Sequence, residues 1–383
     1  MKWHQAHTTW FFETFVLHPF LPDYTPFRGE FRWLFNSYYN SLGQGAPEKQ
    51  LRASFSRPSL EEVLAFRAHV DEAMEKLLGG RIHDDAARRI VLGLNHEQQH
   101  QELMLTDIKH AFFTNPLRPA YEGGVLAEAP DVSPCELTWH RFRGGLTETG
   151  YAIDPVNRLD FCFDNETPRH KVYLETFGIA YRDVTCREYL EFMSDDAYAR
   201  PEFWLSDGWE AVKKQGWRAP LYWERDDTDS AGWRVFTLRG WHPLSALLHT
   251  PVCHVSFFEA DAFARWRGCR LPNEAEWELA AHKSPIHGNL LETGRLHPAT
   301  AYGDSLDQLF GDTWEWTASP YTGYPGYKPV PGALGEYNGK FMSGQMILRG
   351  GSCVTPAGHL RITYRNFFQP TTRWQFTGIR LAT

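Results

Sequence analysis

Two histidines stand four residues apart in the stretch NHEQQHQELMLTDIKHAFF (residues 95–113), and this spacing suits a metal site. On a helix, residues i and i+4 lie on one face with their Cβ atoms about 5–6 Å apart, so His96 and His100 can offer ring nitrogens to the same ion. Neutral imidazole suits iron, zinc, copper and nickel, and sites with three protein ligands and open positions are typically catalytic. The same spacing is also common on solvated helix faces, so the pair needs a third ligand before it predicts a metal centre.

A third ligand has to come from another part of the chain. The opening residues, KWHQAHTTWFFETF, carry His4 and His7 on a predicted helix, and their spacing does not choose between them. His110 lies ten residues beyond His100 and is rotated away from its face. The order His-Glu-x-x-His, with Glu97 after the first histidine, is also that of zinc metalloproteases, which are a rival on the motif alone.

The elements that carry these histidines are predicted to be helices. Apolar residues recur with a period near 3.6 in residues 59–80, where Ser59 and Glu62 form a capping box. A longer helix is predicted over residues 84–113, and a shorter amphipathic helix over residues 3–18. Short connections favour antiparallel neighbours, so a small helical bundle is the expected arrangement.

The remainder of the chain has a different texture. From about residue 117, proline and glycine become frequent and apolar runs become short, which predicts a loop-rich fold with short strands. Helices are predicted within it at residues 184–195, 256–268 and 273–282. We therefore expect an α+β protein of two domains, 1–125 and 126–383, with the boundary in PAYEGGVLAEAPDVSP.

The composition argues against several classes of function. The 383 residues are 42% hydrophobic and 22% charged, with a net charge of -8 and interspersed signs, so no nucleic-acid footprint is present. No apolar run approaches the roughly 18–20 residues of a membrane span, and no signal-peptide pattern opens the chain. The six cysteines form no CxxC pair, so a reduced, cytoplasmic protein without a cysteine zinc site is expected.

Several stretches together resemble one family over nearly the whole chain. The bundle carries AHTTWFFETF and HEQQHQELMLTDIKHAF, and the second part carries FDNETPRHKVYLETFGIAYRDVT, PVCHVSFFEADAFARWRGCRLPNEAEWELAA, GDTWEWTASPY and LRGGSC. This combination resembles the ergothioneine-biosynthetic sulfoxide synthases. The resemblance implies an N-terminal DinB-like helical bundle followed by a loop-rich α+β domain of the C-type-lectin-like, formylglycine-generating-enzyme type.

The resemblance also implies a metal and a reaction. The family's iron triad falls on His7, His96 and His100, with His4 as a neighbour or a helix-surface residue. Mononuclear non-haem Fe(II) and O2 would then join a cysteine-type thiol to the imidazole C2 of Nα-trimethylhistidine and oxidise the sulfur to a sulfoxide. Three histidine ligands leave positions for both substrates and O2, which would make the reaction effectively intramolecular. In this light the metalloprotease alternative loses.

Substrate residues are implied by the same resemblance. Gln99 resembles the glutamine that contacts trimethylhistidine. The stretch YRNFFQP resembles the one that closes the pocket, with Asn366 at the trimethylammonium end and Phe367 and Phe368 lining it. Aromatic faces attract quaternary ammonium groups, although a phenylalanine pair is more often part of a core.

Two further stretches complete the expected site. Tyr38 and Tyr39 resemble catalytic tyrosines, one of which could donate a proton during the O2 chemistry and steer it toward C–S coupling. Arg52 is the expected partner of the thiol substrate's carboxylate. Lys49 stands where relatives can carry arginine, and because lysine cannot make the bidentate pair, free cysteine is favoured over γ-glutamylcysteine as the thiol.

The chain also departs from the family pattern. It begins at the KWHQAHTTW segment, so the bundle is expected to lack a first helix, with His7 close to a terminus that frays. Formylglycine-generating enzymes use two reactive cysteines, and only Cys353 stands in the corresponding region, so that activity is not expected. The second domain is interpreted as scaffold and pocket wall. Its expected framework residues are Trp314, Glu315, Trp316, Arg349, Gly350 and Gly351.

Other functions stay open at this level. An ovothiol-type relative would join cysteine to unmethylated histidine at a different ring carbon, and a selenium-using relative is a further alternative. From another class, a ligand-binding protein built on the second domain could use the bundle for dimerisation. Such a protein has no reason to hold one iron per chain, so metal analysis separates these hypotheses.

Overall fold

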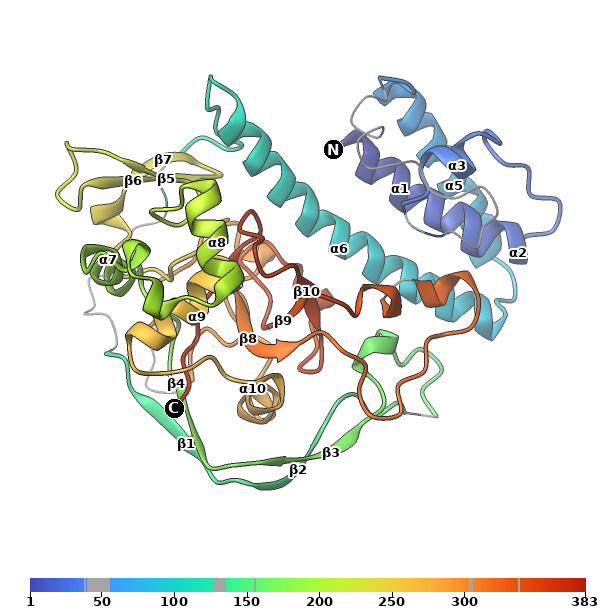
Figure 1. Cartoon of the computed structure of the whole chain (residues 1–383). Helices are drawn as coiled ribbons and strands as arrows, with labels where there is room; N and C mark the ends of the chain where they lie inside the picture. The colour runs from blue at the N-terminus through green and yellow to red at the C-terminus, as the bar shows by residue number, and fades with distance from the viewer. Residues whose placement is uncertain are drawn as a thin grey trace. The chain divides into compact units, whose positions relative to one another are not determined.

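The chain is described by a computed structural model over residues 1–37, 39, 56–124, 126, 136–154, 156–302, 306–336 and 338–383 (Figure 1). It divides into two compact units. Unit 1 comprises Met1–Met104, Tyr151–Pro168 and Gly323–Phe341, and unit 2 comprises Leu105–Gly150, Arg169–Thr322 and Met342–Thr383. This division, which passes through a helix and returns twice to unit 1, differs from the single predicted boundary near residue 125.

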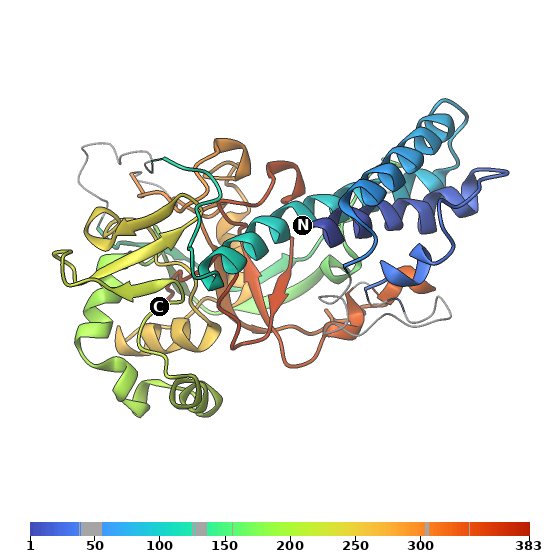
Figure 2. The same cartoon turned by 90° about the horizontal axis from the view of Figure 1, so that it is seen from above.

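Unit 1 is mainly helical. Its helices are α1 (Lys2–Phe12), the π-helix η1 (Glu13–Leu17), α2 (His18–Phe20), α3 (Phe31–Leu34), α5 (Leu60–Leu78) and the first part of α6 (Asp84–Thr114), with 3-10 turns at η3 (Asp164–Glu166), η8 (Ala333–Glu336) and η9 (Gly339–Phe341). The blue helix α1 packs along the lighter blue α5, as both views show (Figures 1 and 2). The three helices predicted for this part are therefore present, close to their expected bounds.

Local sequence explains where these helices begin and how closely they pack. Ser59 and Glu62 form the predicted capping box of α5, with the Ser59 backbone N–H donating to the Glu62 carboxylate at 2.8 Å. At Gly93 of α6, an added Cβ would lie 2.7 Å from the ring of Phe12 and 3.0 Å from that of Phe11. Because real Cβ atoms do not approach so closely, glycine permits the contact between α6 and α1.

Unit 2 holds the strands. A four-stranded sheet has the order β10-β9-β8-β11, with β8 Trp314–Pro320, β9 Met346–Arg349, β10 Asn366–Phe368 and β11 Thr377–Gly378. Its pairs are antiparallel except for β11 with β8, which are parallel. Smaller antiparallel sheets are formed by β5 Trp223–Arg225, β6 Trp233–Thr237 and β7 Gly240–Pro243, by β1 Trp139–Phe142 with β4 Phe177–Ala180, and by β2 Gly145–Thr149 with β3 His170–Leu174. Short strands among loops are what the sequence predicts.

Helices of unit 2 confirm three predictions and correct one omission. α7 (Cys186–Ser194), α9 (Phe257–Trp266) and α10 (Glu274–Ala281) lie within the predicted ranges. α8 (Ser206–Gln215) was not predicted, because its early Gly208 weakens the helical pattern. That glycine packs against Phe258 of α9, where a Cβ would lie 2.8 Å from the Phe258 side chain. Across the described residues, no helix combines the length and the apolar character needed to cross a membrane.

The core of unit 2 contains a buried ionic framework. Glu315 accepts hydrogen bonds from Trp277 Nε1 at 2.6 Å and from Arg380 Nε at 2.8 Å. Arg349 lies 3.0 Å from a carboxylate oxygen of Glu278 and 3.1 Å from one of Glu274. Removing one member of such a network would leave a buried charge without compensation, at a cost of about 3–5 kcal/mol. The predicted framework role of Glu315 and Arg349 therefore agrees with their contacts.

Candidate functional site

Three histidines of unit 1 form the group that could hold a metal ion in the described part of the chain. They are His7 on α1 and His96 and His100 on α6, and their ligand atoms all lie within 4.8 Å of one another. Nitrogens that share one ion at about 2.1 Å lie at most about 4 Å apart, so the cluster is only slightly wider than a loaded site. The three side chains are 0%, 1% and 7% exposed, respectively. Buried imidazoles gathered in this way fit a metal such as iron or zinc.

His7 is held by contacts on three sides. Its Nδ1–H donates to the carbonyl oxygen of Phe35 at 2.6 Å. Its ring is stacked between Trp3, with centroids 4.6 Å apart, and Trp10, with centroids 5.3 Å apart. Because a carbonyl can only accept, the Nδ1 proton leaves Nε2 with the lone pair that a ligand needs. Trp10 is itself anchored, since its Nε1 donates to the Arg32 carbonyl at 2.9 Å.

His100 has a histidine neighbour of its own. Nδ1 of His100 lies 2.7 Å from Nδ1 of His4, and His4 is only 8% exposed. The prediction that His4 is a neighbour is thus confirmed, and the alternative of a helix-surface residue is wrong, because α1 turns this side toward α6. Burial lowers the pKa of His100 well below its usual value, and the rings of His96, His7 and His4 add to this effect. A neutral ring is the form that binds metals.

Tyr39 packs on Trp10, one of the two tryptophans whose rings are stacked on His7. It is fully buried, with its ring 5.5 Å from that of Trp10 and 5.0 Å from that of Phe15. The side chain of Asn36 fixes its backbone, accepting from Tyr39 N at 3.0 Å and donating to Tyr39 O at 2.9 Å. The same short segment therefore supplies both the Phe35 carbonyl and Tyr39. Tyr38 lies outside the described residues.

Glu97 has contacts that do not fit a protease base. Its carboxylate lies 2.7 Å from Nη2 of Arg67 on α5, forming an ion pair between the two helices. A general base of a metalloprotease has to reach a metal-bound water, whereas this carboxylate joins α6 to α5. The His-Glu-x-x-His order in this chain thus has a packing explanation.

Predicted residues for the two substrates are distributed over both units. Gln99 is partly buried on α6, directly before His100. Lys49 and Arg52 lie outside the described residues. The nearby Arg57 lines a cavity of about 590 Å³ in unit 1, together with Arg28.

Asn366, Phe367 and Phe368 form strand β10 of unit 2. The Asn366 side-chain oxygen accepts from the Phe367 backbone N–H at 2.9 Å. The ring of Phe367 is stacked on Tyr321 with centroids 4.0 Å apart and planes at 10°. Phe368 meets Trp374 edge-on at 5.9 Å. All three side chains are partly exposed, so they are not core residues of unit 2.

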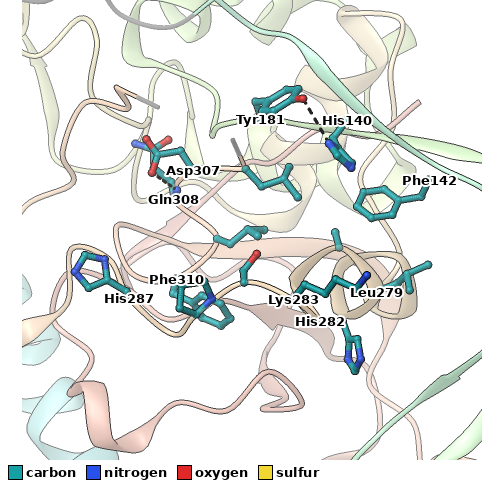
Figure 3. Close-up of a pocket in the computed structure, with 15 residues that line it drawn as sticks. His140, Phe142, Tyr181, Leu279, His282, Lys283, His287, Asp307, Gln308 and Phe310 are labelled. Atoms are coloured by element: carbon teal, nitrogen blue, oxygen red, sulfur yellow. Dashed lines mark hydrogen bonds between the residues drawn. The ribbon is translucent and has the colours of Figure 1, made fainter. Parts of the chain in front are cut away.

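Another cavity lies in unit 2 (Figure 3). This cavity of about 840 Å³ is lined by basic, aromatic and acidic side chains, among them His140, Phe142, Tyr181, Lys283, His287 and Asp307. Nδ1 of His140 lies 3.4 Å from the Tyr181 hydroxyl, and the two side chains are neighbours on one side of the cavity (Figure 3). None of the predicted site residues that the structure describes lines this cavity.

Three residues of the histidine site were not predicted from the sequence. Trp3 and Trp10 stand four residues before and three residues after His7, so helical spacing could have placed both rings beside it. Phe35 acts through its backbone carbonyl, which every residue possesses. No sequence signal could have identified it.

Comparison with known families identifies the kind of domain in the second part of the chain. The family described as Sulfatase-modifying factor enzyme 1-like domain matches residues 140–302 and 293–383. These ranges cover more than half of the chain and lie within the predicted second domain. The expectation of an α+β fold with a domain of the formylglycine-generating-enzyme type is thus confirmed.

Individual relatives define the family more narrowly. Hercynine oxygenase of Mycolicibacterium smegmatis is 31% identical over 335 residues, which span 78% of this chain and 72% of the relative. Hercynine oxygenase of Mycobacterium tuberculosis is 32% identical over 315 residues, spanning 76% and 70%. Ergothioneine biosynthesis protein 1 of Schizosaccharomyces pombe is 28% identical over 58% of this chain and 27% of its own length. The chain belongs to the hercynine oxygenase family, as the sequence motifs indicate.

Proposed function

We propose that the chain is an Fe(II)- and O2-dependent enzyme of ergothioneine biosynthesis that joins a cysteine-type thiol to C2 of Nα-trimethylhistidine and oxidises the sulfur to a sulfoxide. The observation that carries the proposal is the buried group of His7, His96 and His100 in a member of the hercynine oxygenase family. One O2 balances the reaction, because it removes two hydrogens as water and leaves one oxygen on sulfur.

The three histidines are the residues that would hold the iron. His7 presents Nε2 because Phe35 accepts its Nδ1 proton, and His100 is neutral because burial lowers its pKa. When bound, Fe(II) supplies the redox chemistry that connects thiol oxidation to O2. The helices that carry the ligands are the part of the chain that we assign to a DinB-like bundle.

Other residues of the chain would bind the substrates and move a proton. We assign to Tyr39 or Tyr38 the donation of a proton during O2 reduction. The ring of Tyr39 packs on Trp10, whose ring is stacked on His7. Gln99, Asn366, Phe367 and Phe368 are proposed for trimethylhistidine. Arg52 and Lys49 are proposed for the carboxylate of the thiol.

Product analysis tests the proposal directly. The full chain is loaded with Fe(II) without oxygen and mixed with Nα-trimethylhistidine, cysteine and O2. We expect a product whose mass equals both substrates minus two hydrogens plus one oxygen. The His100→Ala variant should give none, whereas His18→Ala, at an exposed histidine of the same unit, should behave as the wild type. Absence of coupled product in the iron-loaded wild type would refute the function.

The same assay identifies the substrates among close alternatives. Histidine replaces Nα-trimethylhistidine in a second arm, and γ-glutamylcysteine replaces cysteine in a third. Preference for unmethylated histidine, with sulfur on the other ring carbon, would identify an ovothiol-type enzyme instead. We expect turnover with trimethylhistidine and cysteine to exceed the other combinations.

A further inference from the structure

His4 and His100 form a contact that the proposed triad does not use. Their Nδ1 atoms are 2.7 Å apart and their ring centroids 5.0 Å apart. Both side chains are buried, so water does not screen the contact. His4 precedes His7 by three residues on α1, and residues so spaced share one helix face. Helix α1 thus brings the ring of His7 into the histidine group and the ring of His4 against Nδ1 of His100.

The contact allows two positions for the shared proton, and ligation of a metal by His100 is compatible with one of them. Two ring nitrogens at 2.7 Å form a hydrogen bond only if one donates and the other accepts. His100 turns Nδ1 toward His4, so the nitrogen left for an ion is Nε2. A nitrogen that binds a metal cannot hold a proton, so the proton of His100 belongs on Nδ1 and is donated to His4. The opposite arrangement would place the proton on Nε2 and block ligation.

His7 shows the same arrangement with a different acceptor. Its Nδ1–H is accepted by the Phe35 carbonyl at 2.6 Å. Ligand histidines commonly give their second ring proton to a carbonyl or carboxylate, which fixes the tautomer and the ring orientation. In His100 the position of that acceptor is occupied by His4. His7 and His100 therefore each have a partner for Nδ1.

We propose that His4 is a positioning residue that accepts the Nδ1 proton of His100 and so holds Nε2 toward the metal. The inference rests on the proposed metal site and adds a fourth histidine that is not a ligand. Loss of such a partner weakens metal binding by about 10- to 100-fold in other proteins. We expect the same weakening of metal binding here when His4 is replaced by a side chain of similar volume that cannot accept a proton.

Two substitutions separate the acceptor from the space that it fills. His4→Leu keeps an apolar side chain of similar size but cannot accept a proton. His4→Asn places a side-chain oxygen about where Nδ1 stands, so it can still accept. Asparagine is close to histidine in helix propensity, and leucine is better than both, so neither change weakens α1 by propensity alone. His18→Leu repeats the change at an exposed histidine of the same unit.

Metal titration of the full chain tests the proposal without relying on activity. Metal-free protein is titrated without oxygen with Fe(II), and in parallel with Co(II), whose visible absorption reports the ligand geometry. His4→Leu should bind one ion about 10- to 100-fold more weakly than the wild type. His4→Asn should recover most of that loss with the wild-type Co(II) spectrum, and His18→Leu should not change the affinity. Circular dichroism checks that each variant keeps its helices.

The outcomes distinguish this inference from the proposed function. If the wild type takes up no ion, or if His100→Ala binds as tightly as the wild type, the metal site itself is refuted and the role of His4 with it. If those two controls behave as expected but His4→Leu keeps the wild-type affinity, only the role of His4 is refuted. Equal loss in His4→Leu and His4→Asn, with a changed Co(II) spectrum in both, would make His4 a ligand and overturn the positioning role.

Discussion

The Nδ1 atom of His7 lies 2.6 Å from the carbonyl oxygen of Phe35, a residue that follows it by twenty-eight positions. The contact joins α1 to the segment after α3 and determines which nitrogen His7 presents to the other two histidines. The same segment continues through Asn36, whose side chain holds the backbone of Tyr39. The proposed ligand His7 and the proposed proton donor Tyr39 are thus positioned by one short stretch of chain.

His100→Ala removes a proposed ligand and should abolish binding of one ion per chain. The loss in Fe(II) affinity should exceed the roughly 10- to 100-fold expected for a residue that only supports a ligand. Alanine is the best helix former, so the helical circular dichroism signal should stay near that of the wild type. Stoichiometric iron in the purified variant would contradict the site.

Tyr39→Phe removes one hydroxyl and keeps the ring that packs against Trp10 and Phe15. If Tyr39 donates the proton, substrate affinity should change little, while the products shift from sulfoxide toward oxidised thiol. The measurement is the ratio of the two products, with Tyr38→Phe as the matched neighbour. A product ratio equal to that of the wild type in both single variants and in the double variant would exclude a tyrosine role.

Gly93→Ala should destabilise unit 1 although alanine favours helices. The new Cβ would meet the buried rings of Phe12 and Phe11 at 2.7 and 3.0 Å, and overpacking of this kind costs about 1–3 kcal/mol. Phe11 also contacts His96, with centroids 4.9 Å apart, so Fe(II) affinity should fall as well. Urea unfolding measures the first effect. Leu94→Ala at an exposed position of α6 is the control, and a more stable Gly93→Ala protein would show that the rings move aside without cost.

Lys109 should give unit 2 a distinctive dependence on alkaline pH. Its Nζ lies 2.6 Å from His254 Nε2, it is fully buried, and burial lowers the pKa of Lys109 to about 8. Below that pH the Lys109 amine is protonated in both the folded and the unfolded chain, so it adds no pH dependence to the free energy of unfolding. Between about pH 8 and the unfolded value near 10.4, the unfolded chain binds more protons, so the free energy of unfolding rises with pH, by about 3 kcal/mol in total.

Lys109→Met is the matching variant, since it keeps the length of the side chain without an amine. The difference in unfolding free energy between wild type and variant should grow in favour of the wild type from pH 8 to pH 10. Urea unfolding at several pH values in this window measures that difference. A constant difference would mean that Lys109 keeps an ordinary pKa in the folded chain.

Local patterns in the sequence predicted the helices that carry the site. Periodic apolar residues and the Ser59–Glu62 capping box located α5, and the spacing of His96 and His100 placed both rings on one face of α6. These predictions succeed because helix periodicity and capping depend on residues within a few positions of one another. α8 was missed because local patterns are the only signal of this kind, and Gly208 weakens the helical pattern. The Phe258 side chain that packs on this glycine lies far away in sequence.

Tertiary structure decided what the spacing left open between His4 and His7. Both histidines lie on one face of α1, and helical periodicity treats them alike. Packing of α1 against α6 at Gly93 brings His7 into the group with His96 and His100, and brings His4 against Nδ1 of His100. Family motifs named the same triad, but the partners of its rings come from chain folding. A backbone carbonyl such as that of Phe35 has no signature in sequence, because every residue carries one and only folding selects which of them meets a histidine.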